Sequence, residues 1–413
     1  MTTIVKVPAT VESFFSDLDV PLTDVQRLHL AEYGTGLAVS ENVTITGING
    51  LLVNGVDQSN MNRTLTQATW DTEALNRGRL GLLQRHPGTM WGQKGLLVVD
   101  DTFIDKDGKL LPGAAYLYNH SKGRTEWGQQ LVTLQYVGPR VDYPLDFRQY
   151  FKETGPEVVS GEVEFKRKQE LAAEMIRAML ALGCPARTVL MDSWYLGKDF
   201  VKALEDEELD WIARLKSDRL VMLNGVYVPI KEFAGTLGPG DVRQVEVGKR
   251  KYWVYDFKTR LKKIGKVKAV ISWKEADLSD DPRYFATNHR PWVAEGILLR
   301  YTRRWAIEEF YRDAKQHLGL GECQLRSAEG TRRHWYMVLL MHSLLTFWGV
   351  KHRRTVGSGK DGALTLGDCQ RALEDEVFRD LLELIIEKAL GDEDRMPKEK
   401  QRLIMELMGV LKG

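Results

Sequence analysis

Residues 301–315 read YTRRWAIEEFYRDAK, and the interpretation of the whole chain depends on how polar residues are spaced in this stretch. Their spacing predicts an α-helix, in which successive residues turn by about 100°. One face of that helix would carry Tyr301, Arg304, Glu308, Arg312 and Lys315. Four of these residues fall within an arc of roughly 60°, and Arg312 lies close beside them. A tyrosine, cations and a carboxylate on one face are suited to binding phosphodiesters.

An adjacent face of the same helix is apolar and can pack against a core. Its members recur three and four residues apart and are Ile307, Phe310, Tyr311, Ala314 and Leu318. Glu309 would point away from both faces. Most charged helix faces are simply solvated, so a functional interpretation of this helix needs support from the rest of the chain.

The composition predicts a soluble globular protein. The chain has 413 residues, 43% of them hydrophobic and 28% charged, which suits about two or three structural units. It has no apolar run of about 18 residues and no basic-then-apolar start, so we expect a cytoplasmic, nucleoid-associated protein without a membrane partner. The three cysteines are too scattered to predict a disulfide framework or a zinc site.

The net charge of +1 does not by itself indicate a nucleic-acid-binding protein. The basic residues are, however, clustered along the chain. Clusters occur at Lys249–Lys251, at 258–268, at Arg300–Arg304, at Arg332–Arg333 and at Lys351–Arg354. A single basic run is usually solvated, but several runs around a carboxylate site favour a surface that follows phosphates.

The first part of the chain, residues 1–90, has apolar residues at helical spacing and is expected to be a helical, DNA-binding region. Residues 59–71 fit a pair of short helices of the helix-turn-helix type. That motif is weakly specified by sequence, so DNA contact and simple packing stay equal alternatives.

Two apolar runs end in acids. Residues 95–102 read GLLVVDDT and residues 187–192 read RTVLMD, which predicts two buried strands that deliver Asp100 or Asp101, and Asp192, at their carboxyl ends. An antiparallel hairpin is expected after the first of these strands, over 114–136.

A β-rich pattern with turns follows at residues 217–275, where Asn224-Gly225 is a hairpin signal. Residues 335–350 predict a buried helix that is too short for a membrane span. Residues 364–413 predict amphipathic helices.

Three carboxylates thus stand out, and they are the kind of ligands that hard divalent cations prefer. Asp100 or Asp101, Asp192 and Glu308 would together hold a pair of magnesium ions, with manganese as a substitute. Any one strand-end aspartate alone is more often a turn or helix cap. That explanation is harder to sustain for all three.

With these residues identified, the chain resembles bacterial DDE transposases of the insertion-sequence-four superfamily. Tyr301, Arg304, Glu308 and Lys315 match the superfamily signature Y-x2-R-x3-E-x6-K, and Asp100-Asp101-Thr102 is similar to its first aspartate motif. The resemblance covers about residues 95–348. It implies an α/β fold with an RNase H-like core, a β-rich insertion, and helical regions at both ends.

The resemblance also implies residue roles. Asp100, Asp192 and Glu308 would be the catalytic metal ligands, while Tyr301, Arg304, Arg312 and Lys315 would bind DNA. Alternation along a strand sends Asp100 and Asp101 to opposite sides. Asp100 fits the D-x-T register better, and Asp101 is kept as the alternative first aspartate.

The domain organisation that follows has five segments. They are the N-terminal helical region 1–90, a first core part 91–216, the β-rich insertion 217–275, a second core part 276–350 with the Glu308 helix, and a C-terminal helical region 351–413.

The expected function is an insertion-sequence transposase that cuts transposon ends and joins them to target DNA by two-metal phosphoryl transfer. Its partners would be double-stranded inverted-repeat ends, target DNA and a second copy of the chain in a homodimer. Two alternatives stay open at this point: an RNase H-like nuclease or resolvase without strand transfer, and a domesticated DNA-binding protein without catalysis.

Overall fold

The computed structural model describes residues 3–53, 57–352 and 364–390. The chain forms two compact units. The first contains Met1–Met90, Ile104–Gly128 and Tyr311–Gly413, and the second contains Trp91–Phe103 and Gln129–Phe310.

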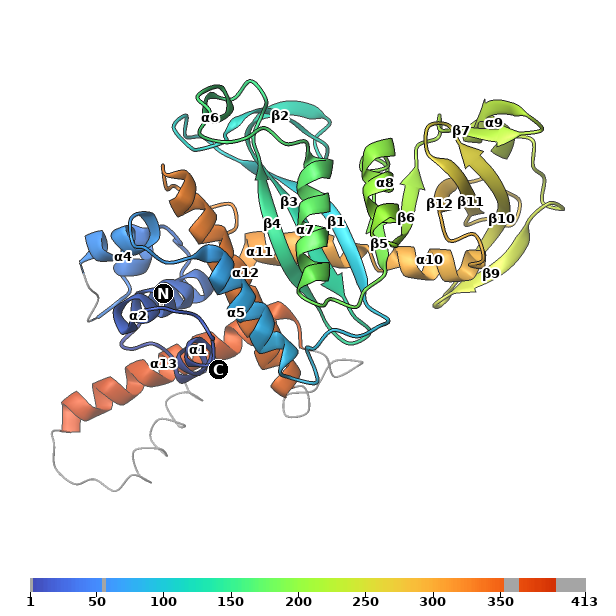
Figure 1. The fold of residues 1–413 in the computed structure, drawn as a ribbon. Coiled ribbons are helices and arrows are strands. Elements are labelled where there is room, and N and C mark those ends of the chain that lie inside the picture. Colours follow the sequence, from blue (N-terminus) through green and yellow to red (C-terminus); the bar gives the residue numbers. More distant parts are fainter. Residues whose placement is uncertain (1–2, 54–56, 353–363, 391–413) are drawn as a thin grey trace. The chain divides into compact units, whose positions relative to one another are not determined.

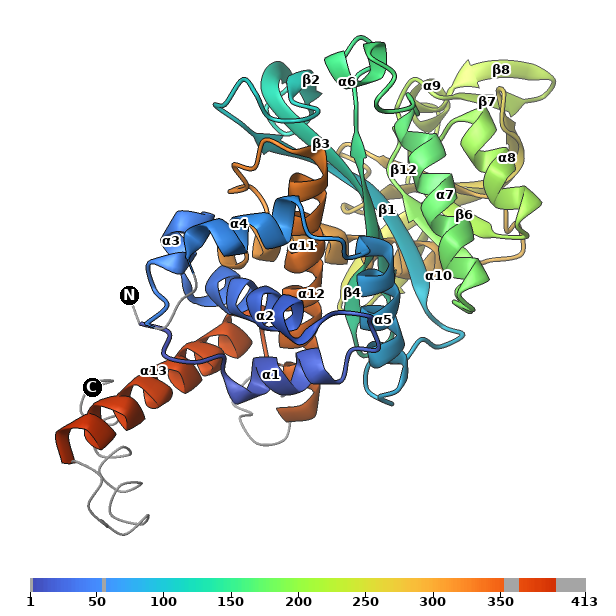
Figure 2. The same ribbon diagram turned by 60° about the vertical axis from the view of Figure 1, so that its left-hand side comes forward.

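The first unit is mostly helical. Its helices are α1 (Ala9–Ser16), α2 (Asp24–Val39), α3 (Ile45–Asn49), α4 (Gln58–Thr66), α5 (Thr72–Gln84), α12 (Ala328–His352) and α13 (Leu366–Leu390). Helices α2, α4, α5 and α13 all contact α12, which runs through the middle of this unit (Figure 2). The helical pattern expected for the N-terminal region is therefore found, and it packs on a helix from the far end of the chain.

Buried polar side chains fasten these helices to α12. The guanidinium of Arg333 donates hydrogen bonds to the carbonyl oxygens of Ala68 and Trp70 at 2.7 and 2.9 Å. Arg79 donates to the hydroxyl of Ser343 at 2.7 Å. Because unsatisfied buried donors are costly, these bonds fix the turn between α4 and α5 on α12.

The buried helix expected at 335–350 is the central part of α12, with Trp335 fully buried. No helix in the described ranges is both long enough and apolar enough to cross a membrane. The expected C-terminal helices are represented by α13, and residues 391–413 lie outside the described residues.

The second unit is built on a mixed β-sheet (Figure 1). It contains most of β1 (Leu96–Asp105) and of β3 (Arg124–Val137), and all of β4 (Asp142–Tyr150), β5 (Thr188–Met191), β6 (Asp210–Leu215), β7 (Leu220–Leu223), β8 (Val226–Pro229), β9 (Arg243–Val247), β10 (Arg250–Leu261), β11 (Gly265–Trp273) and β12 (Arg283–Thr287). The order is β3-β1-β5-β6-β12-β11-β10-β7-β8, with β4 beside β3 and β9 beside β10. Strand β2 (Ala115–Asn119) pairs antiparallel with the first residues of β3, which is the hairpin expected from the sequence.

Strands β1, β5 and β6 are parallel, and their register aligns two of the predicted acids. Val99 pairs with Met191, so Asp100 and Asp192 are the next residues along neighbouring strands. Strand β5 ends at Met191, but β1 continues to Asp105. The expectation that the first strand ends at its two acids is therefore wrong, because β3 on its other edge lets β1 continue beyond β5.

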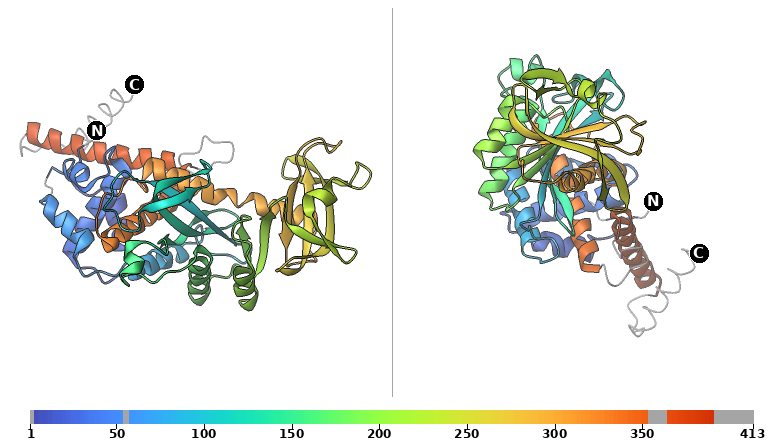
Figure 3. Two further views of the ribbon diagram at one scale, coloured as in Figure 1. Left: turned by 90° about the horizontal axis from the view of Figure 1, so that it is seen from above. Right: turned by 90° about the vertical axis from the view of Figure 1, so that its right-hand side faces the viewer.

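Helices cover both faces of this parallel region. Helices α7 (Lys168–Ala181) and α8 (Lys198–Asp206) lie on one face, and α10 (Ala294–Thr302) lies on the other (Figure 3). The short helix α6 (Pro156–Val159) precedes α7. Burial on both faces explains why residues 96–99 are all apolar.

The β-rich segment expected at 217–275 forms β7 to β11 and the short helix α9 (Ile230–Ala234). The hairpin between β7 and β8 turns at Asn224 and Gly225, whose φ angles of 49° and 86° are those of a two-residue turn that favours these residue types. A longer hairpin joins β10 to β11 through Lys262 and Lys263, and Lys263 has a φ of 70°.

The single helix expected over residues 301–315 is wrong in one respect. The segment forms two helices, α10 ending at Thr302 and α11 (Trp305–His317), with a turn at Arg303 and Arg304. In this turn the amide of Arg304 donates to the carbonyl of Tyr301 at 3.0 Å, three residues back. A bond to the residue three positions back, instead of the four of an α-helix, is frequent where an α-helix ends. Glu308 therefore follows Arg304 on a new helix.

Candidate functional site

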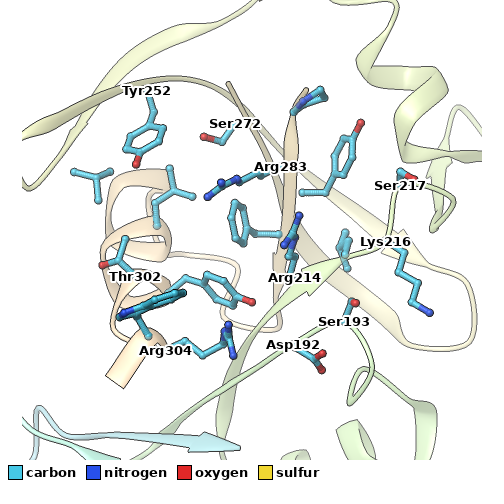
Figure 4. A pocket seen from close by; sticks show the side chains of 18 of the residues that line it. Asp192, Ser193, Arg214, Lys216, Ser217, Tyr252, Ser272, Arg283, Thr302 and Arg304 are labelled. Atoms are coloured by element: carbon cyan, nitrogen blue, oxygen red, sulfur yellow. The ribbon is translucent and has the colours of Figure 1, made fainter. Parts of the chain in front are cut away.

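The second unit contains a cavity of about 1010 Å³ that collects five of the residues singled out from the sequence. They are Asp100 from β1, Asp192 after β5, and Tyr301, Arg304 and Glu308 from α10, the turn and α11. Figure 4 shows Arg304 and Asp192 near one another on its floor. The sheet and the helix pair thus bring together residues that are more than 200 positions apart in the chain.

Asp100 is held in the cavity by Arg304. Its Oδ2 accepts a hydrogen bond from Nη1 of Arg304 at 2.6 Å, and its side chain is 19% exposed. Burial, together with the nearby charges of Asp192 and Asp101, outweighs Arg304 and raises the pKa of Asp100 to about 7. A carboxylate with this pKa is poorly neutralised by its protein surroundings and favours additional positive charge.

Asp101 lies on the opposite side of β1 and does not line the cavity. Its Oδ2 accepts from Nζ of Lys168 on α7 at 2.7 Å, and its Oδ1 accepts from the hydroxyl of Tyr195 at 3.2 Å. The side chains of Asp101 and Lys168 are only 9% and 7% exposed. Asp101 is therefore engaged in a buried ion pair that joins β1 to α7.

Asp192 is oriented by the loop that follows β5. Its Oδ1 accepts hydrogen bonds from the amides of Trp194 and Tyr195 at 2.8 and 3.2 Å, which is the local bonding typical of an aspartate at a turn. This capping role and a place in the cavity are compatible, because a carboxylate has a second oxygen.

Glu308 and Tyr301 complete the floor of the cavity. Nη2 of Arg304 donates to Oε1 of Glu308, so the guanidinium joins Asp100 and Glu308. Burial works against the charge of Arg304, but Asp100, Tyr301 and Glu308 raise its pKa above the ordinary value. Burial also raises the pKa of Tyr301 to about 12, so its hydroxyl stays a hydrogen-bond donor. Glu309 is exposed and does not line the cavity.

Sequence reasoning missed the basic wall of the cavity. Arg214 from β6, Arg250 from β10 and Arg283 from β12 line it together with Tyr252. None of these three arginines forms an ion pair within the described ranges. The cluster at 249–251 was noticed in the sequence, and Arg214 interrupts the buried pattern of β6 as an exposed residue. Those two signals could have identified part of the wall.

The other two predicted DNA-binding residues lie elsewhere. Arg312 and Lys315 are on the later part of α11, in the first unit, and both are exposed. Arg312 forms an ion pair with Asp313 at 3.0 Å.

The donor set of the cavity fits a hard divalent cation, since its acidic groups offer only oxygen atoms. In the part of the chain that the structure describes, however, no three histidine, cysteine, aspartate or glutamate side chains come close enough to hold a metal ion. The guanidinium of Arg304 instead lies between Asp100 and Glu308. It supplies the positive charge that two nearby carboxylates require.

The cavity of this α/β unit thus gathers four carboxylates, those of Asp100, Asp192, Asp218 and Glu308, and four arginines, a combination typical of proteins that handle phosphate esters. The chain belongs to the DDE superfamily endonucleases, whose family model matches residues 29–239, just over half of the chain. A second model, described as a transposase DDE domain, matches residues 167–344. The first match includes Asp100 and Asp192, and the second includes Asp192 and Glu308.

A probable transposase for insertion sequence element IS701 from Microchaete diplosiphon is 29% identical over 170 residues. The match covers 40% of this chain and 43% of that relative, so the chain matches less than half of the relative's length. Among solved structures, the NurA nuclease from Sulfolobus solfataricus aligns with a TM-score of 0.26 and 10% identity, over 64% of this chain and 86% of that one. A TM-score this low does not establish a shared fold.

Proposed function

We propose that this chain is an insertion-sequence transposase that cuts transposon ends and joins them to target DNA by DDE phosphoryl transfer. The observation that carries the proposal is the convergence of Asp100, Asp192 and Glu308 with Tyr301 and Arg304 in one cavity. The relative named as a transposase supports the same function. A dimer in the DNA complex is part of the proposal, since two transposon ends have to be joined.

The narrower parts of the proposal rest on sequence and strand order. The match of Tyr301, Arg304, Glu308 and Lys315 to the Y-x2-R-x3-E-x6-K signature supports a place in the insertion-sequence-four superfamily. The order β4-β3-β1-β5-β6, with β1, β5 and β6 parallel, supports an RNase H-like core. The strands β7 to β11 would then be the insertion between the second aspartate and the glutamate.

Asp100, Asp192 and Glu308 would hold two magnesium ions. These ions, when bound, activate the attacking oxygen and stabilise the leaving one. For the three carboxylates to serve as ligands, Arg304 has to release at least one of its two acidic partners. We infer that Arg304 then turns to a phosphate oxygen, for which its fork of N–H donors is suited.

Tyr301 would donate its hydroxyl hydrogen to the same phosphate, since burial keeps that hydroxyl protonated. Arg214, Arg250 and Arg283 would neutralise neighbouring phosphates along the wall of the cavity. The chain's own residues would thus position the scissile phosphate before any bond breaks. Asp101 would have no direct part, because Lys168 and Tyr195 hold it on the other side of β1.

A single assay tests the proposal against its alternatives. The chain is incubated with labelled duplexes taken from the ends of the DNA element that encodes it, a target plasmid, and magnesium or manganese. Joined products that disappear on chelation of the metal are expected. Cleavage without joining would identify a nuclease or resolvase, and a shifted but uncut complex would identify a DNA-binding protein without catalysis.

Lys315→Ala is expected to weaken binding of the transposon end. Lys315 is exposed, and losing one phosphate contact at about 0.1 M salt lowers affinity by up to roughly tenfold and reduces the salt slope by about 0.9. Fluorescence anisotropy of a labelled end duplex over a salt series measures both quantities. Gln316→Ala, an exposed neighbour on the same helix, is the control. An unchanged salt slope for Lys315→Ala would remove this residue from the DNA-binding set.

A further inference from the structure

A second cavity, of about 650 Å³, adjoins the catalytic cavity within the same unit. The two share Ser193, Lys216 and Asp218 as lining residues. Beyond this border the second cavity is lined by Arg219, Lys262 and Lys263. Four of its lining side chains are therefore cations and one is an acid.

The cations of this second cavity have few acids near them among the described residues, and the one acid in its lining, Asp218, interacts electrostatically with Arg219. No ion pair of Lys216, Arg219, Lys262 or Lys263 is found within the described ranges. Some basic residues on the neighbouring strands are paired with acids. Lys268 of β11, for example, lies 2.9 Å from Asp256. A cleft that is lined mainly by charges of one sign focuses their field and attracts ions of the opposite sign.

The guanidinium of Arg219 provides independent support, because one of its N–H groups has no hydrogen-bond acceptor among the residues described. Its Nη2 donates to the carbonyl oxygen of Leu196 at 3.2 Å. Its Nε is buried and has no hydrogen-bond partner among the residues described. A buried guanidinium N–H without an acceptor is costly, and an anion that enters the cavity could satisfy it.

The position of the second cavity relative to the carboxylates suggests which anion it takes. In Figure 4 Arg304 lies on one side of Asp192 and Ser193, and Lys216 lies on the other. Arg304, a proposed holder of the transposon-end phosphate, is therefore separated from Lys216 by the proposed metal ligand Asp192. A DNA strand that crosses the carboxylates has to continue on the Lys216 side.

We propose that the second cavity binds the phosphodiester backbone of the DNA segment on the far side of the scissile phosphate from the transposon end. This inference rests on the proposed transposase function. Lys262 and Lys263, at the turn between β10 and β11, contact that backbone together with Lys216 and Arg219. Before cleavage the segment is the flanking DNA, and during joining it is the target DNA, which presents the same backbone chemistry.

The test compares two duplexes from the element's end, one with flanking DNA and one that stops at the cleavage position. The variant Lys262→Gln/Lys263→Asn removes two charges from an exposed turn, and asparagine tolerates the positive φ of 70° at position 263. Lys266→Gln, an exposed lysine on the same hairpin that does not line the cavity, is the control. Anisotropy titrations over a salt series give affinity and salt slope for each duplex.

We expect the double variant to bind the flanked duplex more weakly than wild type, by roughly tenfold or more at about 0.1 M salt, and with a slope smaller by about 1.8. Binding of the duplex without flank should stay within about twofold of wild type. Equal losses on both duplexes, or none on either, would overturn the inference.

Joining of the pre-cut end to a target plasmid then separates the two sources of the segment. A joining defect in the double variant assigns the cavity to target as well as flank, and normal joining restricts it to flank. If wild type itself binds neither duplex, the proposed function fails. That result differs from every outcome expected of the variant alone.

Discussion

Glu308→Gln is expected to lose metal-dependent cleavage of the transposon end by more than about 100-fold while retaining end binding. Removing a group that only supports a metal ligand already costs about 10- to 100-fold, and Glu308 is proposed as a ligand itself. The glutamine keeps the size of the side chain and can still accept a hydrogen bond from Arg304. Loss of its negative charge also removes repulsion toward a phosphate in the cavity, so the affinity for the end should not fall.

The adjacent glutamate provides a matched control for this experiment. Glu309→Gln makes the same chemical change on the same helix, but Glu309 is exposed and lies outside the cavity. Cleavage of a labelled end in magnesium, and anisotropy of the same duplex without metal, should show wild-type values for Glu309→Gln. Normal cleavage by Glu308→Gln would refute its assignment to the metal site.

Residues close together in the chain could be placed from sequence because their pattern is periodic. Alternation along a buried strand separates Asp100 from Asp101, and the structure has Lys168 against Asp101 and Arg304 against Asp100. The strand-to-helix position of Asp192 and the hairpin at Asn224-Gly225 also follow from local chemistry. These features depend on the nearest neighbours of each residue.

Features that depend on distant segments could not be placed in this way. The turn at Arg304 lies in a stretch whose helical spacing is unbroken, and only the folded chain brings Asp100 to that guanidinium. Arg214 and Arg283 come from strands β6 and β12, which are neighbours in the sheet but about 70 residues apart in sequence. The two arginines lie close together because of the order of the strands in the sheet, and the periodic pattern of apolar residues in the sequence does not predict that order.

The two adjacent variants Asp100→Asn and Asp101→Asn are expected to have opposite effects. Asp101→Asn should lower stability and keep cleavage, whereas Asp100→Asn should lose cleavage and keep stability. The ion pair of Asp101 with Lys168 is buried, and removing one partner of a buried pair typically costs about 3–5 kcal/mol because the remaining charge is uncompensated. Asp101→Asn should therefore lower the urea midpoint of unfolding markedly. At low temperature, where the variant is still folded, it should retain most of its cleavage.

Asp100→Asn should show the reverse. The pKa of Asp100 is raised to about 7, so its ionised form is disfavoured in the folded state, and stability falls as pH rises from the unfolded-state pKa, about 4, towards 7. A neutral asparagine avoids that penalty, so the urea midpoint at neutral pH should equal or exceed that of wild type while cleavage is lost.

The double variant Asp101→Asn/Lys168→Gln tests the physical reason for the expected instability. It replaces the ion pair with a neutral hydrogen-bonding pair, and replacing both partners of a buried pair is far less costly than removing one. Most of the lost stability should return, with cleavage still present. If Asp101→Asn instead abolished cleavage at full stability and Asp100→Asn were active, Asp101 would be the first catalytic aspartate, and β1 would have to present its other face to the DNA.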